Sequence, residues 1–154
     1  MGGSGSPLPP SIYSEPSRFL ATLRAFPSVQ TGPAKTILIC EDDRNLRQLV
    51  RVVLGDGYRF VEADTGREAL DLAYKLRPDL IILDLMLPGA SGFDVLTELR
   101  AKLPGDETRV IVMSAWGHAD EAALNAGADR FVAKPFEADE LTSVVSEVLG
   151  EARG

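Results

Sequence analysis

Five short apolar segments alternate with amphipathic segments over residues 35–149, and this alternation constrains the fold more than any other feature of the chain. Residues 36–40 (TILIC) and 80–83 (LIIL) show no polar alternation, which is typical of strands that are covered on both faces. Strands separated by helical segments predict parallel pairing through helical crossovers. We therefore expect an α/β fold with a five-stranded parallel sheet and helices on both of its faces.

Capping residues and periodicity set the expected boundaries of these elements. Strands are predicted at residues 36–40, 58–61, 80–83, 110–113 and 130–133, and helices at about 43–54, 65–76, from 91 onward, 120–126 and 138–149. Asp43 is a suitable N-cap, and Thr65 and Ser91 each begin a stretch with the spacing of a capping box. In the helix that begins at Ser91, we expect Phe93, Leu96 and Leu99 to face the core.

The chain divides into one folded domain and flanking segments. Residues 1–6 (MGGSGS) are expected to be a remnant of an expression vector. Six of the ten prolines lie in the first 33 residues, which predicts that residues 7–33 form an extension outside the core, with a possible short helix at 17–26. The folded domain is expected at 34–150 and a tail at 151–154, with no second domain.

Charge and cysteine content exclude several classes of function. The net charge of −7 disfavours binding to nucleic acid or to an anionic membrane surface by charge alone. A single cysteine, Cys40, provides no disulfide framework, and the lone His118 lacks the neighbours that a zinc site needs. Cys40 is expected to act as a small buried hydrophobe and His118 to lie on an exposed loop. With no secretory signal or membrane-length apolar run, we expect a cytoplasmic protein.

Polar residues with a common chemical theme follow four of the predicted strands. Glu41 and Asp42 follow the first strand, Asp84 the third, Ser114 the fourth and Lys134 the fifth. Ligands of open parallel sheets bind beyond the carboxyl ends of the strands, so these side chains are expected to converge on one crevice. Singly, each has an ordinary explanation as a helix cap, a turn residue or a solvated charge. Their joint occurrence is what favours a functional site.

A cluster of three carboxylates needs a counter-charge, and oxygen ligands suit a hard divalent cation such as Mg²⁺. With the cluster neutralised, one carboxylate can attack phosphorus and form an aspartyl phosphate. Asp84, flanked by Lys134 and Ser114, is the expected nucleophile. Lys134 and Ser114 would then hold the remaining phosphoryl oxygens.

At these positions the chain resembles the receiver domains of bacterial two-component response regulators. The resemblance rests on Glu41-Asp42-Asp43, on residues 79–89 (DLIILDLMLPG) and on Lys134-Pro135-Phe136. It implies a flavodoxin-like fold with strand order 2-1-3-4-5, and a phosphoacceptor role for Asp84. It also implies partners, namely a sensor histidine kinase or phosphotransfer protein and a downstream protein that the sequence does not identify. A homodimer is possible.

The resemblance assigns further roles residue by residue. It implies that Asp42, Asp84 and the backbone carbonyl of Met86 bind Mg²⁺ directly, and that Glu41 acts through metal-bound water. It implies that Ser114 and Lys134 bind the phosphoryl group. The Lys134–Pro135 peptide bond is expected to be cis, and Phe131 is expected to be the switch aromatic. Phe131 has an equally good reading as mere packing. Met86 and Trp116 are large and apolar at positions that influence phosphoryl lifetime in the family, which predicts shielding of the phosphoryl group from water.

Two other functions, a phosphatase and a pseudo-receiver, predict residues that can be looked for in this sequence. A phosphatase of the haloacid-dehalogenase type would carry a second acid two residues beyond its nucleophile, where this chain has Met86. A pseudo-receiver that only binds partners would lack part of the acidic cluster or the lysine, and this chain has both. We expect a phosphoacceptor and not a multiple-turnover enzyme. Either the receiver acts without an output domain, or the chain stops after its last helix because an output domain was removed.

Overall fold

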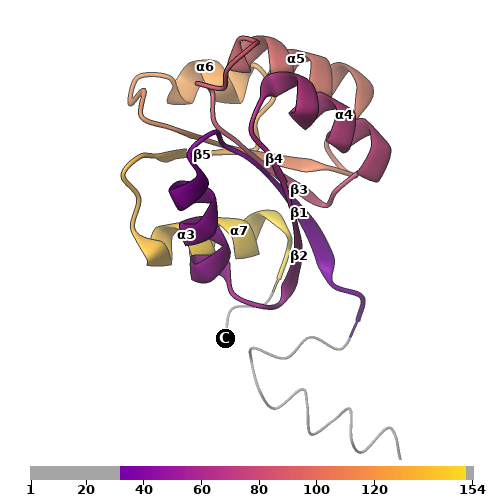
Figure 1. Cartoon of the computed structure of the whole chain (residues 1–154), viewed down its shortest axis with the longest axis vertical. Helices are drawn as coiled ribbons and strands as arrows, with labels where there is room; N and C mark the ends of the chain where they lie inside the picture. Colours follow the sequence, from indigo (N-terminus) through magenta and orange to yellow (C-terminus); the bar gives the residue numbers. More distant parts are fainter. Residues whose placement is uncertain (1–31, 152–154) are drawn as a thin grey trace, which may run out of the picture. The chain divides into compact units, whose positions relative to one another are not determined.

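A parallel five-stranded sheet forms the centre of the domain (Figure 1). The computed structural model describes residues 32–151, so the expected helix at 17–26 and the terminal segments 1–31 and 152–154 lie outside the described residues. The strands are β1 (Lys35–Cys40), β2 (Tyr58–Ala63), β3 (Leu80–Leu83), β4 (Arg109–Ser114) and β5 (Arg130–Ala133). Their spatial order is β2-β1-β3-β4-β5, with every pair parallel, which confirms the predicted fold.

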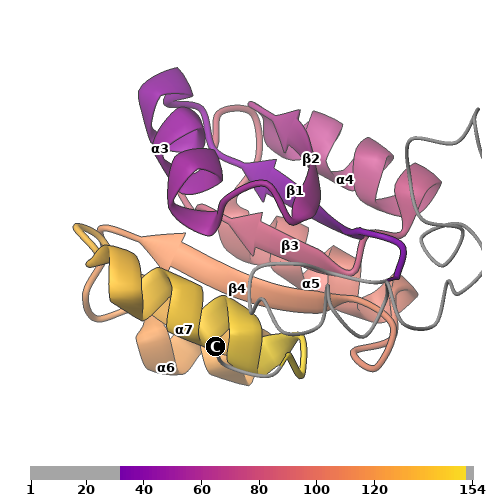
Figure 2. The ribbon, with the colours of Figure 1, turned by 90° about the horizontal axis from the view of Figure 1, so that it is seen from below.

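Within residues 32–151, five helices cover the two faces of the sheet, as Figures 1 and 2 show. They are α3 (Arg44–Leu54), α4 (Gly66–Leu76), α5 (Gly92–Lys102), α6 (Asp120–Asn125) and α7 (Ala138–Val148). Helices α3 and α7 lie on one face, whereas α4, α5 and α6 lie on the other. Helix α6 has 6 residues and each of the others has 11.

The apolar strand residues divide between two cores. Ile37, Ile39, Leu80 and Ile82 pack toward α3 and α7, and the alternate residues Leu38, Cys40, Ile81 and Leu83 pack toward α4 and α5. All four residues of β3 are completely buried, because this strand has a neighbour on each side and helices over both faces. Cys40 is buried within its core, as expected for a small hydrophobe, and burial raises the pKa of its thiol.

The helix boundaries agree with the predicted caps at two positions and differ at one. The side chain of Asp43 accepts hydrogen bonds from the amides of Asn45 and Leu46, and Thr65 accepts one from the amide of Glu68. The Glu68 carboxylate, however, accepts from the amide of Asp64 instead of returning to Thr65.

The predicted capping box at Ser91 is wrong. The Ser91 side chain makes no cap hydrogen bond, and α5 begins where the Gly92 amide donates to the Leu85 carbonyl at 3.2 Å. This contact turns the helix so that Val95 is buried with Leu96 and Leu99, whereas Phe93 is only half-buried. Tertiary contact with the preceding loop therefore sets the start of α5, not local capping chemistry. Among residues 32–151, no helix has both the length and the apolarity to cross a membrane.

Close approach at Gly92 generates the first prediction. A Cβ atom at this position would overlap the backbone of Leu85, which no side-chain rotation can relieve. We expect Gly92→Ala to lower the free energy of unfolding by about 3 kcal/mol in urea titrations. Gly117→Ala is the matched control, because a Cβ at Gly117 meets nothing within 4 Å. Similar unfolding free energies for the two variants would contradict the close-packing argument.

Candidate phosphoryl and metal site

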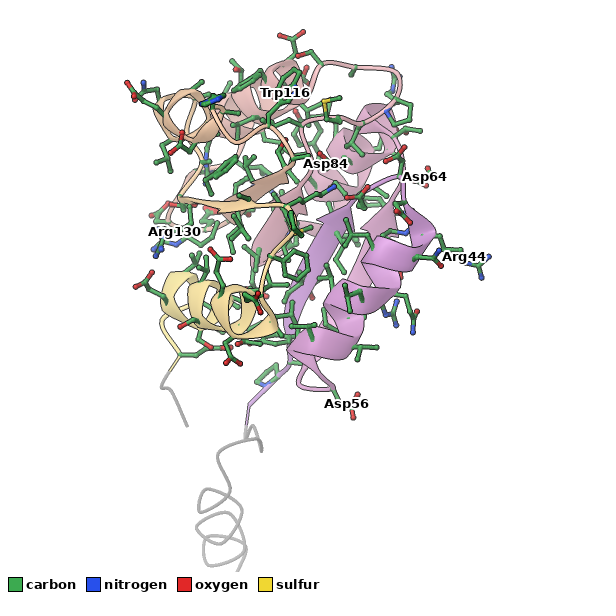
Figure 3. All side chains as sticks on the ribbon, turned by 90° about the vertical axis from the view of Figure 1, so that its left-hand side faces the viewer. Arg44, Asp56, Asp64, Asp84, Trp116 and Arg130 are labelled. Atoms are coloured by element: carbon green, nitrogen blue, oxygen red, sulfur yellow. The ribbon has the colours of Figure 1, made fainter. Side chains whose placement is uncertain are left out.

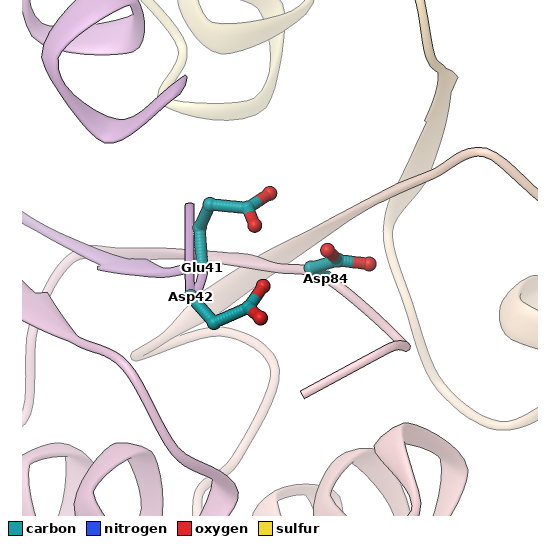
Figure 4. A group of neighbouring side chains, drawn as sticks. All are labelled: Glu41, Asp42 and Asp84. Atoms are coloured by element: carbon teal, nitrogen blue, oxygen red, sulfur yellow. The ribbon is translucent and has the colours of Figure 1, made fainter. Parts of the chain in front are cut away.

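Three carboxylates gather at the carboxyl ends of β1 and β3 (Figure 4). Glu41 and Asp42 directly follow β1, and Asp84 directly follows β3, its neighbour in the sheet. Ligand oxygens of all three lie within 4.8 Å of one another. Glu41 and Asp84 are buried and Asp42 is exposed, so the cluster has a buried floor and one side open to solvent.

Lys134 brings a positive charge to the cluster from the end of β5. Its ammonium group donates to Glu41 Oε1 at 2.5 Å and to Asp84 Oδ2 at 2.8 Å. The lysine side chain is 19% exposed, and those of Glu41 and Asp84 are 2% and 4% exposed. Because solvent is largely excluded, these ion pairs are screened less than surface pairs.

Burial and pairing act in opposite directions on these groups. Burial raises the pKa of the Glu41 carboxyl, and the Asp84 charge adds to the rise, although hydrogen bonds from Lys134 and Asp43 oppose it. Burial works against the charge of Lys134, but its hydrogen bonds to Asp84 and Glu41 outweigh this, so the pKa of Lys134 is raised. The ammonium group is therefore held charged at neutral pH.

Main-chain amides fix the orientation of the two buried carboxylates. Asp84 Oδ1 accepts from the amide of Met86 at 3.0 Å, and Glu41 Oε2 accepts from the amide of Asp43 at 3.0 Å. Each carboxylate thus has one oxygen on a backbone amide and the other on Lys134. The turns that follow β1 and β3 present their side chains in this way because each turn closes within two residues.

Ser114 and Phe131 lie on the neighbouring strands. Ser114 is buried at the end of β4, where its carbonyl accepts from the Lys134 amide at 2.9 Å and its hydroxyl accepts from the Trp116 amide at 3.2 Å. Phe131 is half-buried on β5 against the core under α4 and α5. The Lys134–Pro135 bond is cis, as the resemblance implies. Figure 3 labels Asp84 near the middle of the folded domain and Trp116 closer to its edge. His118 is exposed, as expected from the sequence.

The donor set suits a hard divalent cation. Oxygen atoms are the preferred ligands of Mg²⁺, and in the described part of the chain the cluster consists of three carboxylates with no cysteine or histidine among them. Asp42 and Asp84 would hold the ion, with Glu41 alongside them. Glu41, Asp42, Asp84, Ser114 and Lys134 thus lie at the carboxyl ends of four strands, whereas Phe131 lies within β5. The acidic cluster has the composition that a magnesium site requires.

The sequence analysis missed Arg47 and Glu62, whose side chains lie next to the turn formed by Glu41, Asp42 and Asp43, here called the acidic turn. Arg47 Nη1 donates to the backbone carbonyl of Glu41 at 2.6 Å, and Arg47 Nε pairs with Glu62 at 2.6 Å. An arginine next to the apolar stripe of the first helix was the available signal. This position alone does not show whether the arginine side chain extends into solvent or contacts the end of β1.

Comparisons with known proteins agree with this geometry. A family model described as response regulator receiver domain matches residues 37–146. Response regulator MprA of Mycolicibacterium vanbaalenii is 40% identical over 116 residues, which are 73% of this chain and 49% of that protein. Sporulation initiation phosphotransferase F of Bacillus subtilis is 38% identical over 116 residues, covering 73% of this chain and 92% of that protein. The chain therefore spans about half the length of MprA.

A solved structure extends the similarity to three dimensions. The CheY-like response regulator receiver domain protein of Methanospirillum hungatei matches with a TM-score of 0.71 and 27% sequence identity. The match covers 77% of this chain and 95% of that chain. The fold thus has a counterpart in a solved receiver domain.

The ion pairs of Lys134 generate the second prediction. We expect Lys134→Met to lower the free energy of unfolding by about 2 kcal/mol at pH 7, because two buried carboxylates lose their counter-charge. Since the pKa of Lys134 is raised, its ammonium group stays charged and the contribution is lost on the alkaline side only as the pH rises above about 10. The difference from the parent should narrow as the pH falls through the raised pKa of Glu41, where protonation removes a paired charge.

Urea titrations from pH 4 to pH 9 measure this effect. Lys75→Met, at an exposed position in the last turn of α4, is the control and should change the unfolding free energy by less than about 0.5 kcal/mol. A loss for Lys134→Met that is constant across the whole pH range would show that the ion pairs are not its cause.

Proposed function

Because the chain belongs to the response regulator receiver domain family, we propose that it accepts a phosphoryl group on Asp84 and changes its protein-interaction surface in response. Receiver domains are phosphoacceptors of two-component signalling. The observation that carries the assignment to Asp84 is that its buried carboxylate accepts a hydrogen bond from Lys134 and lies within 4.8 Å of ligand oxygens of Glu41 and Asp42. The proposed domain boundaries, 34–150, contain the family match at 37–146.

In the proposed reaction, an oxygen of the Asp84 carboxylate attacks the phosphorus atom of the donor. A bond forms between that oxygen and phosphorus, and the bond from phosphorus to the donor's leaving atom breaks with its electron pair. The amide of Met86, which donates to Asp84 Oδ1, keeps the carboxylate in one orientation for the attack. The product is an aspartyl phosphate that remains next to Lys134.

Asp42, Asp84 and the Met86 carbonyl are the proposed direct ligands of Mg²⁺, with Glu41 acting through metal-bound water. When bound, the ion supplies positive charge that neutralises the cluster and the phosphoryl oxygens. Lys134 already donates to two carboxylates, and after transfer its ammonium would bind a phosphoryl oxygen. The exposed side of the cluster at Asp42 supports entry of the ion from solvent.

Ser114 and Phe131 are the proposed switch. The Ser114 hydroxyl accepts a bond from the Trp116 amide, and its proton is free to be donated to a phosphoryl oxygen. That new bond would draw the segment after β4 toward Asp84 and favour a second conformation of the domain. Phe131, half-buried on the next strand, would then turn inward.

The proposed partners are a sensor histidine kinase or phosphotransfer protein, a downstream protein, and a second copy of the chain in a homodimer. Sporulation initiation phosphotransferase F, which this chain covers almost completely, supports transfer to or from a protein phosphodonor. We propose no multiple-turnover activity on an external substrate, because Met86 occupies the place of the second acid of haloacid-dehalogenase phosphatases. A cytoplasmic location stays a prediction.

Intact-protein mass spectrometry after incubation with acetyl phosphate and Mg²⁺ tests the central proposal. We expect a single base-labile phosphoryl adduct on the parent and none on Asp84→Asn, because the amide is a far weaker nucleophile than the carboxylate. Asp43→Asn is the matched control, since asparagine also caps a helix and Asp43 is not a proposed ligand. Omission of Mg²⁺ should also remove the adduct. An adduct that survives in Asp84→Asn would reject the assignment.

The rim of the site generates a further prediction about the lifetime of the aspartyl phosphate. Asp84 is 3% exposed, whereas Met86 and Trp116, on the segments that follow Asp84 and Ser114, are 53% and 52% exposed. If these side chains exclude water from the phosphoryl group, Met86→Asn and Trp116→Asn should shorten its half-life several-fold. Leu76→Asn, an exposed position at the far end of α4, is the control. An unchanged half-life in both rim variants would make shielding the wrong explanation.

A further inference from the structure

Arg47 reaches from α3 to the main chain of the acidic turn. Its Nη1 atom donates to the carbonyl oxygen of Glu41 at 2.6 Å, and its Nε atom pairs with Glu62 on β2 at 2.6 Å. The arginine side chain is only 14% exposed, so the contact is sheltered from solvent. Arg47 thus joins the first helix, the edge strand and the peptide that carries the acidic residues.

The carbonyl that Arg47 binds belongs to the peptide bond between Glu41 and Asp42. Rotation of this peptide would move both acidic side chains relative to Asp84. The Glu41 amide donates to the Ala63 carbonyl at 3.0 Å, and its carboxylate is held by Lys134 and Asp43. Among the described contacts of this turn, the Arg47 bond is the one that restrains the carbonyl side, toward Asp42.

Glu62 holds the guanidinium of Arg47 in the required plane. Its second oxygen pairs with Arg51 at 2.5 Å, so one carboxylate aligns two arginines along α3. Although partial burial opposes the negative charge, the hydrogen bonds from Arg51 and Arg47 outweigh it and lower the pKa of Glu62. The planar fork of an arginine gives two directed bonds from one rigid group, which suits it to fix a peptide.

We propose that Arg47 is a positioning residue for the divalent-cation site, acting through the Glu41–Asp42 peptide and held in place by Glu62. The inference rests on the magnesium site of the proposed function. Partners of metal ligands commonly change metal affinity by tenfold or more, because they fix the geometry in which the ligands bind. Arg47 differs from such partners in contacting the backbone between two acidic residues and not a ligand side chain.

The test is the dissociation constant for Mg²⁺ alone, measured by titration calorimetry on the folded chain at fixed ionic strength. We expect Arg47→Met to raise this constant about tenfold. Arg51→Met is the matched control, because it removes the same charge and the same partner, Glu62, but leaves the bond to Glu41 intact. Its dissociation constant should stay within about twofold of the parent value.

A second variant guards against loss of folding in Arg47→Met. Glu62→Gln keeps one oxygen that can accept from an arginine but removes the negative charge and the second acceptor, so it weakens the pairing that orients Arg47 and should raise the dissociation constant about threefold. Unfolding free energies without Mg²⁺ separate this effect from stability, because a purely structural role would lower stability and leave affinity unchanged.

The outcomes separate this inference from the proposed function. Equal dissociation constants for Arg47→Met and Arg51→Met, or an unchanged constant in Glu62→Gln, overturn the positioning role alone. Absence of Mg²⁺ binding in the parent overturns the metal site and this inference with it. If the parent protein binds Mg²⁺ but forms no phosphoryl adduct, the phosphoacceptor assignment is overturned and the positioning role of Arg47 is not.

Discussion

The arrangement of this domain depends on an electrostatic constraint at one end of its sheet. Three carboxylates within 4.8 Å of one another repel, and burial of two of them strengthens the repulsion. The ammonium group of Lys134 offsets this negative charge by donating to Glu41 and Asp84. It does so from the end of β5, which lies two strands from β3 and three from β1. A single side chain therefore spans the carboxyl edge of four strands, and the site exists only if these strands keep their order and register.

The apolar core supplies that order. The side chains of β3 are completely buried and point alternately toward the two helix layers. A shift of β3 by one residue would turn each side chain toward the opposite layer, where it would lose the neighbours against which it packs. Register in turn places Asp84 one residue beyond β3 and Glu41 one residue beyond β1, at the same level of the sheet. Hydrophobic packing thus determines where the charges meet, and Lys134 offsets the repulsion that results.

The sequence predicted the parts of the molecule that local patterns control. The uninterrupted apolar run of residues 80–83 located β3 to the residue, because a buried parallel strand has few alternatives. The predicted bounds of β5, 130–133, also agree with the structure. Prediction from the sequence failed where tertiary contact overrides a local pattern. Ser91 has the spacing of a capping box, but the approach of Gly92 to Leu85 sets the helix start and buries Val95 in place of Phe93. Arg47 was missed for the same reason, since its partners lie on another strand and on the main chain.

Rigidity is distributed unevenly around Asp84, and this bears on how a switch could operate. Glu41 is held through its amide, its carbonyl and both carboxylate oxygens, so the floor of the site has little freedom. The segment after β4 is held differently: among the contacts of residues 32–151, the Ser114 side chain bonds the Trp116 amide alone, and Ala123 is the one buried residue of the 6-residue helix α6. A short helix with small buried side chains loses little packing energy when it shifts. Since the charges that would receive a phosphoryl group are fixed, movement on phosphorylation should be expressed in this weaker segment between β4 and β5.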